Sequence, residues 1–180
     1  LLTDIQSVAF DPDNIKIEKN TGSLHNEFLK HRISLIPLYI DPETYNYSLL
    51  FELKVEMNDD TTMNVYNGDF NIYPLKNEYL EKVESGDVPT IEMLKNIDKN
   101  FFNLNNPLSN SKKKEIFRPY NNKNISKEDF YMLITELKDT GSEDDKQIID
   151  LYAVPSIGTT RVHSRHNNLP TVVYTFTKDT

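Results

Sequence analysis

Two neighbouring histidines, His163 and His166 in the stretch RVHSRHNN, are the first residues whose types and spacing could do chemistry. A three-residue spacing can place two imidazoles on one face of a helix, where they could bind a metal ion. No acidic third ligand lies nearby, however, and Arg161 and Arg165 would repel a cation. Asn167 continues the stretch as a loop. We therefore expect a surface or interface here rather than a metal site.

A second candidate lies in SLHNEFLKHRISLIPL, residues 23–38. Ser23 followed by His25 has the residue types of a nucleophile and its base. A serine at the start of a helix is usually a cap, however, and neither His25 nor His31 has accompanying catalytic groups. The sequence therefore predicts no catalytic site in this stretch.

Other clusters of charged or small residues also have simpler explanations than chemistry. The acidic clusters at residues 59–60 and 143–145 fit no calcium-loop spacing, and charged turns are normally solvated. The lysine run at residues 112–114 predicts a solvated loop. Gly22 and Gly158 belong to no phosphate-binding pattern. We expect neither a metal ion nor a cofactor.

The composition of the 180-residue chain argues against further classes of function. Its net charge is -8, and affinity for nucleic acid comes largely from lysine and arginine, so a duplex-binding surface is not expected. The chain has no cysteine, which excludes disulfides, zinc-thiolate sites and thiol nucleophiles. It has no long apolar run and no basic N-terminus followed by an apolar segment, so the sequence predicts neither a membrane span nor a signal peptide.

Extended segments and short helices should position these residues. Residues 7–18 are predicted to be extended, with a bend at residues 11–13. A helix should follow, capped by Ser23, and it should end before Pro37 because the residue preceding a proline disfavours the α region. The residues expected on the apolar face of this helix are Leu24, Phe28 and Leu29.

The remainder of the chain predicts mainly strands. Residues 49–57 alternate apolar and charged side chains, and residues 63–73 resume the extended pattern after a polar turn, which indicates neighbouring antiparallel strands. The apolar side of the first strand is predicted to hold Phe51, Leu53, Val55 and Met57. Further strands are expected at residues 130–137 and 147–154, joined as a hairpin, and at residues 171–177.

Between these strands, residues 90–102 are compatible with a helix, and residues 103–124 predict a loop because they are rich in Asn, Ser and Lys. Strands dominate, helices are short, and the connections favour antiparallel pairing. The sequence therefore predicts a fold of the α+β class.

Three stretches, in this order, carry a resemblance to a known family. VAFDPDNIKIEKNTGSLHNEFLKHRISLIPL, residues 8–38, combines a strand, an Asn-Thr step, an acidic helix residue, a His-Arg pair and a Leu-Ile-Pro-Leu tail. It resembles the α-like subunits of DNA-directed RNA polymerases, which include the third-largest subunit of eukaryotic RNA polymerase II, its archaeal counterpart and the bacterial alpha N-terminal domain. LLFELKVEMNDDTTMNVYNGDF, residues 49–70, and IIDLYAVPSIGTTRVHSRHNNLPTVVYTF, residues 148–176, are similar to later parts of the same family.

The resemblance implies a fold in two parts. Residues 1–40 and 158–180 would belong to a mixed α/β dimerisation domain, interrupted by an inserted, mostly antiparallel β domain at residues 41–157. Residues near 74–125 match nothing in the family and would form a lineage-specific insertion. The helices that flank these parts in the family are absent, so we expect the chain to be the middle of a longer subunit.

The resemblance also implies an architectural function. The chain would pair with a smaller α-like subunit, whether separate or fused to it, and scaffold the two largest catalytic subunits for transcription. No residue of the chain would be catalytic, nucleic acid would be reached only through the complex, and no membrane would be involved. The Asn- and Lys-rich composition suits a large DNA virus. The protein would then act in the virion and host cytoplasm, whereas a cellular eukaryotic subunit would act in the nucleus.

The resemblance further implies a set of partner-binding residues. Arg32 ranks first, because arginine is enriched at interfaces and its planar guanidinium pairs with carboxylates and carbonyls. The complete set is Asn20, Glu27, His31, Arg32, Arg161, His163 and Arg165.

Departures from the family pattern limit what the resemblance carries over. Ser34 replaces a glycine usual before the apolar tail, and residues 161–163 replace a Lys-Glu-His step. The cysteine cluster of many relatives is absent, so no metal site is carried over. Two alternatives remain: a stand-alone β-sandwich that binds proteins, and a metal-dependent hydrolase using His163 and His166, which predicts bound zinc or manganese.

Overall fold

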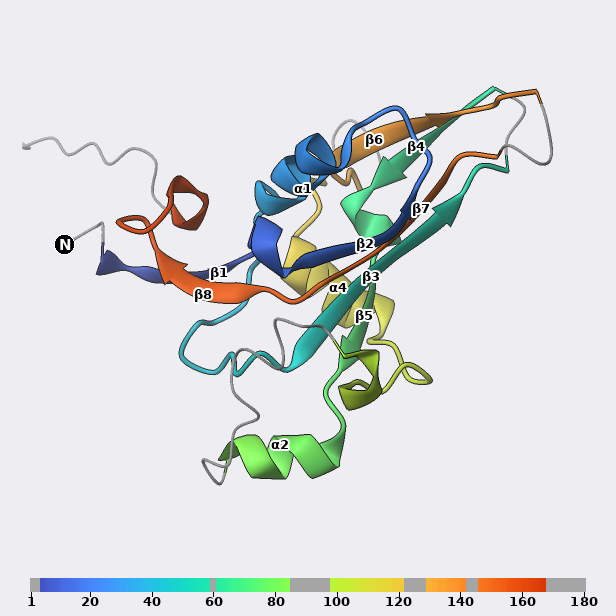
Figure 1. Ribbon diagram of the computed structural model, residues 1–180. Helices are drawn as coiled ribbons and strands as arrows, with labels where there is room; N and C mark the ends of the chain where they lie inside the picture. The colour runs from blue at the N-terminus through green and yellow to red at the C-terminus, as the bar shows by residue number, and fades with distance from the viewer. Residues whose placement is uncertain (1–3, 59–60, 85–97, 122–128, 142–145, 168–180) are drawn as a thin grey trace, which may run out of the picture.

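Antiparallel strands form three sheets in the computed structural model, which describes residues 4–58, 61–84, 98–121, 129–141 and 146–167 (Figure 1). The largest sheet has four strands in the order β2-β7-β3-β5. Two separate ribbons pair β1 with β8 and β4 with β6. Helices and antiparallel sheets occur together, so the expected α+β class is confirmed. The strands are β1 Gln6–Ala9, β2 Ile15–Asn20, β3 Leu49–Glu56, β4 Thr62–Tyr66, β5 Asn71–Pro74, β6 Leu133–Lys138, β7 Ile148–Ala153 and β8 Ser156–Thr159.

Strand β3 lies inside the four-stranded sheet because both of its faces carry apolar side chains. Phe51 and Leu53 are fully buried in the main core, as the alternating pattern predicts. Leu50 is buried on the opposite face, in a second cluster with Tyr73 and Tyr152. The predicted pairing of residues 49–57 with residues 63–73 is correct only in part. Strand β3 pairs with β5, whereas β4 pairs with β6.

The predicted hairpin between residues 130–137 and 147–154 is wrong. Strand β6 pairs with β4, whereas β7 pairs with both β2 and β3. Leu151 of β7 enters the main core and Tyr152 enters the second cluster. A strand buried on both faces belongs inside a sheet and needs two neighbouring strands, which a hairpin with β6 alone would not supply.

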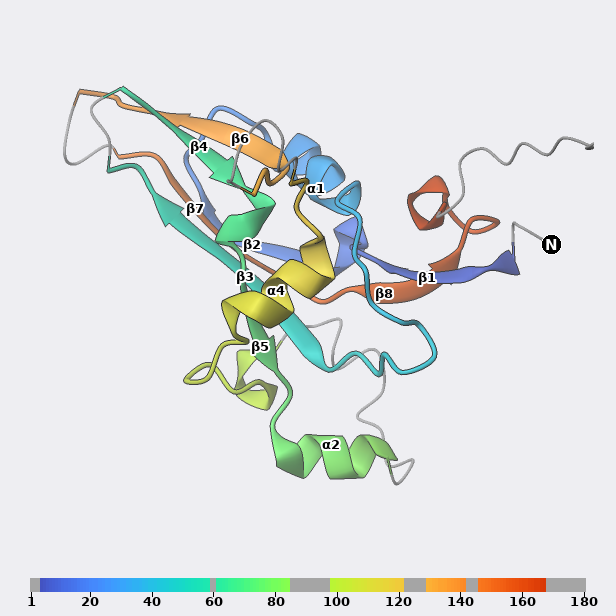
Figure 2. The ribbon, with the colours of Figure 1, turned by 180° about the vertical axis from the view of Figure 1, so that it is seen from behind.

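Short helices complete the fold, and one of them replaces a predicted loop. Residues 110–117 form α4 instead of the loop expected across residues 103–124. The buried side chain of Phe117 packs against Phe51 and Phe70, and such tertiary packing stabilises a short helix of modest propensity. Figure 2 shows α4 lying across a face of the four-stranded sheet. The helical segments are η2 Pro12–Asn14, α1 Asn26–Ser34, η3 Asn67–Asp69, α2 Asn77–Glu84, η4 Lys99–Phe101, α4 Asn110–Phe117 and η6 Ser164–His166.

The lysine run expected as a solvated loop therefore lies on a helix, and two of its side chains are engaged. Lys113 Nζ donates a hydrogen bond to the Gly68 carbonyl oxygen at 3.0 Å, and Lys114 forms an ion pair with Asp129. Burial lowers the pKa of Lys113. These contacts attach α4 to the link between β4 and β5 and to the residues before β6.

Helix α1 ends at Ser34, before Pro37, as predicted, but its start and its buried face differ from expectation. The N-cap residue is His25, and Ser23 does not cap the helix. Leu29 and Ile33 are fully buried, whereas Phe28 is 67% exposed. Since Leu29 and Ile33 are four residues apart, they define the face that packs on the core, and Phe28 falls outside it.

Some sequence-based expectations concern residues that the structure does not describe. These are the acidic clusters at 59–60 and 143–145, the strand at 171–177, and most of the predicted helix at residues 90–102. The described end of that predicted helix contains η4 at residues 99–101. The division into a dimerisation domain and an inserted domain stays a prediction. In the described residues, β2 of the predicted dimerisation part lies in one four-stranded sheet with β3, β5 and β7 of the predicted insert.

Candidate interaction surface

The outer side of α1 carries an apolar stripe with a cation at its centre. Phe28, Arg32 and Leu35 are spaced four and three residues apart, so they lie along one side of the helix. Phe28 and Leu35 are 67% and 53% exposed, and Arg32 is exposed between them. We call these three residues the α1 stripe. It points away from the core because the buried face of the helix holds Leu29 and Ile33.

The α1 stripe continues onto the beginning of β6. Arg32 Nη2 donates a hydrogen bond to the Leu133 carbonyl oxygen at 3.1 Å. Leu133 and its neighbour Met132 each expose almost half of their surface. A guanidinium has five N–H donors, so a single bond to a carbonyl holds Arg32 in place and leaves donors for an acceptor on a partner.

Glu27 and His31 are the other exposed polar residues predicted on α1. Glu27 Oε2 and His25 Nδ1 are hydrogen-bonded at 2.9 Å. The Glu27 pKa is lowered by a backbone hydrogen bond within its own residue and then by His25. His31 is exposed, and its carbonyl oxygen accepts a hydrogen bond from Ser34 Oγ at 2.7 Å. Both side chains are accessible to a partner, and their role as contacts stays a prediction.

Asn20 supports the turn before α1. Its side-chain amide donates to the Leu24 carbonyl oxygen and to Asn26 Oδ1, both at 2.8 Å, and its oxygen accepts from the Gly22 N–H at 3.0 Å. These three bonds fix the path from β2 into the helix. The structure thus gives Asn20 a role in positioning α1.

The second group of predicted residues lies around η6. Arg161 is exposed and pairs with Asp4, with Nη2 and Oδ1 3.0 Å apart. His163 is also exposed, and its Nδ1 accepts a hydrogen bond from the Arg165 N–H at 3.1 Å, which caps η6. Both residues stay candidates for a surface contact.

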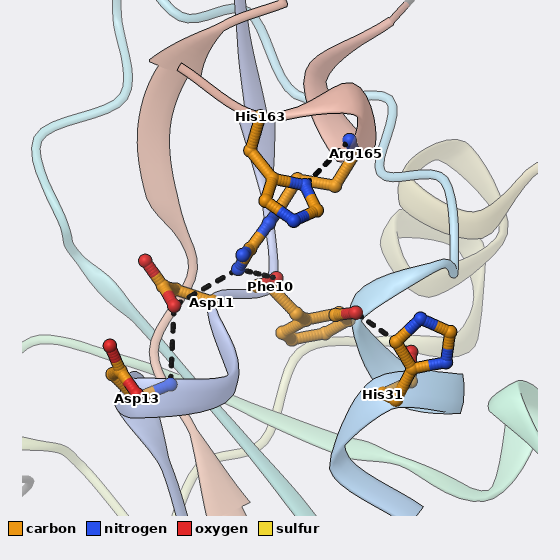
Figure 3. Close-up of polar contacts among 7 residues, drawn as sticks. Phe10, Asp11, Asp13, His31, His163 and Arg165 are labelled. Carbon is orange, nitrogen blue, oxygen red and sulfur yellow. Dashed lines mark hydrogen bonds and ion pairs between the residues drawn. The ribbon is translucent and has the colours of Figure 1, made fainter. Parts of the chain in front are cut away.

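Arg165 differs from these two because its side chain is only 11% exposed. Its Nη1 pairs with Asp11 Oδ1 at 2.9 Å and donates to the Phe10 carbonyl oxygen at 3.3 Å (Figure 3). Asp11 is the N-cap of η2, and η2 packs against α1. Arg165 therefore attaches η6 to the link between β1 and β2. Because η2 in this link packs against α1, the link lies between the predicted residues around η6 and those on α1.

His166 is a buried structural residue, 5% exposed. Its Nδ1 lies 3.1 Å from Ser7 Oγ and 3.2 Å from the Ser7 carbonyl oxygen on β1. Burial lowers the His166 pKa. The ring packs so closely on β8 that a Cβ added at Gly158 would lie 2.4 Å from its Nε2.

The two histidines of the metal-dependent alternative make other contacts in this structure. The Nδ1 atoms of His163 and His166 are engaged with Arg165 and Ser7 respectively. In the described part of the chain, no three His, Asp or Glu side chains come together in a way that could hold a metal ion. Among the residues that the structure describes, no helix has the length and apolar character needed to cross a membrane.

Sequence reasoning missed the exposure of Phe28 and the contribution of Leu35 and Leu133 to this surface. The helical spacing of Leu29, Ile33 and Ile36 was the signal that could have placed Phe28 outward, because those three residues repeat on one face. The contact with Leu133 has no such signal, since it joins residues 101 positions apart.

No protein-family model matches the chain, and no curated protein matches it significantly. The likeness to the polymerase family therefore depends on residues 8–38, 49–70 and 148–176, and the function that it implies is a proposal.

Proposed function

We propose that the chain is a non-catalytic assembly subunit of a multisubunit DNA-directed RNA polymerase. It pairs with a smaller α-like subunit, and the pair scaffolds the two largest subunits. The observation that supports this best is the α1 stripe, an exposed apolar and cationic helix face within the stretch that most resembles the family.

The character of the α1 stripe suits a protein partner. Aromatic residues and arginine are enriched at protein interfaces, and an exposed apolar helix face is a common docking element. Phe28 and Leu35 supply apolar surface, while the Leu133 carbonyl holds Arg32 between them. Nearby Leu133 and Met132 extend the apolar area beyond one helix, which favours a partner surface over a small ligand.

The proposal also assigns a place of action. The subunit works inside the cell, in the virion and host cytoplasm if the polymerase is viral and in the nucleus if it is cellular and eukaryotic. Catalysis belongs to the largest subunits. Binding of nucleic acid by the complex would then not require a basic surface on this chain, whose net charge is -8.

Affinity purification from the native source tests this proposal. The chain should recover two very large subunits and a small α-like partner. Arg32→Ala and Phe28→Ala should each reduce that recovery, because each removes part of the α1 stripe while leaving Leu29 and Ile33 in place. Lys112→Ala is the matched control, since Lys112 is an exposed cation on another helix.

Two results would contradict the proposal. The first is recovery of the chain alone, or with partners that include no polymerase subunit. The second is loss of the folded state in Arg32→Ala, measured by circular dichroism, which would make Arg32 a structural residue rather than a contact.

A further inference from the structure

We propose that a groove between β1 and the segment after α1 binds an extended, acidic peptide segment with large apolar side chains, supplied by a partner protein. The inference goes beyond the assembly function above and does not depend on it. It follows from the shape, the charge and the backbone conformation of the residues around the groove.

The groove has a volume of about 770 Å³ and a mixed lining of apolar side chains and polar groups. Val8 and Ala9 of β1 form one side, and Ile36 lies on the other; all three are buried. At its edge, Leu35 and Tyr39 are 53% and 50% exposed, so large apolar surfaces lie open beside the groove. Residues 37–41, Arg118 and three residues at η6 complete the lining. Exposed apolar side chains beside a groove can accept apolar side chains of an extended chain.

The charge around the groove is opposite to that of the whole chain. The net charge of the protein is -8, yet the groove is lined by Arg118 and Arg165 and a single acidic residue, Asp41. Arg165 already pairs with Asp11. Asp41 Oδ1 accepts a hydrogen bond from the Glu43 N–H at 3.0 Å.

Arg118 is the cation available to a ligand. Its guanidinium carbon lies 4.4 Å from the centre of the Tyr39 ring, and no described carboxylate forms an ion pair with it. The ring positions the guanidinium through a cation–π contact, which leaves the N–H donors at its edge for hydrogen bonding. Guanidinium groups bind carboxylates through paired, charge-assisted hydrogen bonds. The groove therefore complements an acidic group next to apolar side chains.

The backbone at Arg118 supplies an independent indication of function. Arg118 ends α4 in the left-handed conformation, with φ 41° and ψ 65°, and its N–H donates to the Lys114 carbonyl oxygen at 2.8 Å. Glycine is the usual residue at this position of a helix end, because a Cβ there is sterically unfavourable. Pro119 follows and restricts the residue before it further. A residue kept in a costly conformation beside a groove is typical of a binding site.

A peptide suits this groove better than a nucleic acid does. Nucleic-acid sites contain several cations along a backbone track, whereas this groove has one available arginine beside the exposed apolar side chains of Leu35 and Tyr39. A small inorganic anion would use Arg118 but would leave Leu35 and Tyr39 uncovered. An extended peptide uses both features.

The test is a titration of the isotope-labelled full chain, followed by nuclear magnetic resonance. The probe is a pool of short synthetic peptides made of Asp, Glu, Phe and Leu, and the matched pool contains Asn and Gln in place of the acids. The acidic pool should shift the amide resonances of Val8, Ala9, Ile36 and residues 38–41. The amide pool and the Arg118→Gly variant should each bind about tenfold more weakly, the typical effect of losing a charge-assisted hydrogen bond.

Arg118→Gly is chosen because glycine suits the left-handed backbone, so the variant should keep its fold, which its own spectrum verifies. The control Lys112→Ala also removes one cation from α4 and should bind within about twofold of the wild type. Equal affinity of Arg118→Gly and wild type would overturn the proposal, as would shifts confined to other residues or no shifts at all.

Two further probes test whether the groove binds something other than a peptide. Shifts of the same resonances on raising the concentration of the protein alone would assign the groove to a second copy of the chain. Equal shifts with an oligothymidylate would assign it to nucleic acid. Either result would overturn the peptide proposal, and neither bears on whether the chain assembles with polymerase subunits.

Discussion

Two arginines show how single residues are held at the surface of this protein. Arg32 is fixed by one hydrogen bond to the Leu133 carbonyl, from a regular helical backbone. Arg118 is held over the Tyr39 ring from a left-handed backbone that an L-residue rarely adopts. The helical backbone at Arg32 carries no conformational strain, whereas the left-handed backbone at Arg118 lowers the stability of the folded chain.

Arg118→Gly should therefore raise the free energy of unfolding by about 0.5–1 kcal/mol, because relief of the left-handed strain outweighs the lost cation–π contact and the added backbone entropy. Denaturation by urea measures the change. As the control, Lys112→Gly places glycine inside α4 and should lower stability by about 0.5–1 kcal/mol. A less stable Arg118→Gly would show that the tyrosine contact exceeds the strain.

At the scale of the element, α1 has two faces with different roles. Leu29 and Ile33 are fully buried against the core, whereas Phe28 is exposed on the α1 stripe. Burial of an apolar side chain contributes to folding in proportion to the area removed from water. Substitutions on the buried face of this helix should therefore change stability, and substitutions on the α1 stripe should change binding.

Ile33→Ala should lower the free energy of unfolding by about 2–4 kcal/mol, since it removes buried methylene groups and leaves a cavity. Phe28→Ala should change it by no more than about 0.5 kcal/mol, because its side chain lies mostly in water. Chemical denaturation of both variants checks the contrast. A large loss in Phe28→Ala would mean that the α1 stripe is part of the core.

A second element, η6, packs on the β1–β8 ribbon through the His166 ring. Gly158→Ala should cost about 1–3 kcal/mol, because the new Cβ would overlap the ring and force it to move. Gly22→Ala is a milder control, since its nearest neighbours are side-chain atoms at 3.2 and 3.3 Å. Adding His166→Ala to Gly158→Ala should recover part of the loss, and strict additivity of the two costs would contradict this packing.

At the scale of the whole molecule, His166 joins distant parts of the chain. Its ring contacts Ser7, which is 159 positions away, and so connects η6 to β1. The charged and titratable groups that act on it are Arg165 and His163, which lower its pKa, and Asp11, which raises it. Burial is the largest influence, and the folded pKa lies below the ordinary value of 6.5.

This pKa predicts how stability depends on pH. Well above the ordinary pKa of 6.5, His166 is neutral in both the folded and the unfolded state, so its contribution is fully present. As the pH falls below that value, the unfolded chain binds the proton first, and stability is lost until the lower folded pKa is passed. The free energy of unfolding should therefore decrease as the pH falls from about 7 through 6.5 toward the lower folded pKa.

Denaturation at several pH values measures this slope. His166→Gln should flatten it, whereas His163→Gln should change it far less, because His163 influences the His166 pKa less than burial does. An unchanged slope in His166→Gln would assign the effect to other groups.

Local patterns of residues determined the individual elements of this protein. The alternation in β3 predicted the burial of Phe51 and Leu53, and Pro37 predicted where α1 must end. The polar residues on α1, including Arg32 and His31, also predicted an exposed surface, and both side chains are exposed. These features depend on neighbours along the chain, so the sequence alone is enough to predict them.

The tertiary structure decided which face and which partner each element has. It placed β7 between β2 and β3 instead of beside β6, and it made α4 a helix through the packing of Phe117. It turned Phe28 outward and brought Arg118 to Tyr39, 79 positions earlier in the chain by their residue numbers. Contacts between residues far apart in sequence leave no local periodic signal, so only the folded arrangement could reveal the α1 stripe and the groove.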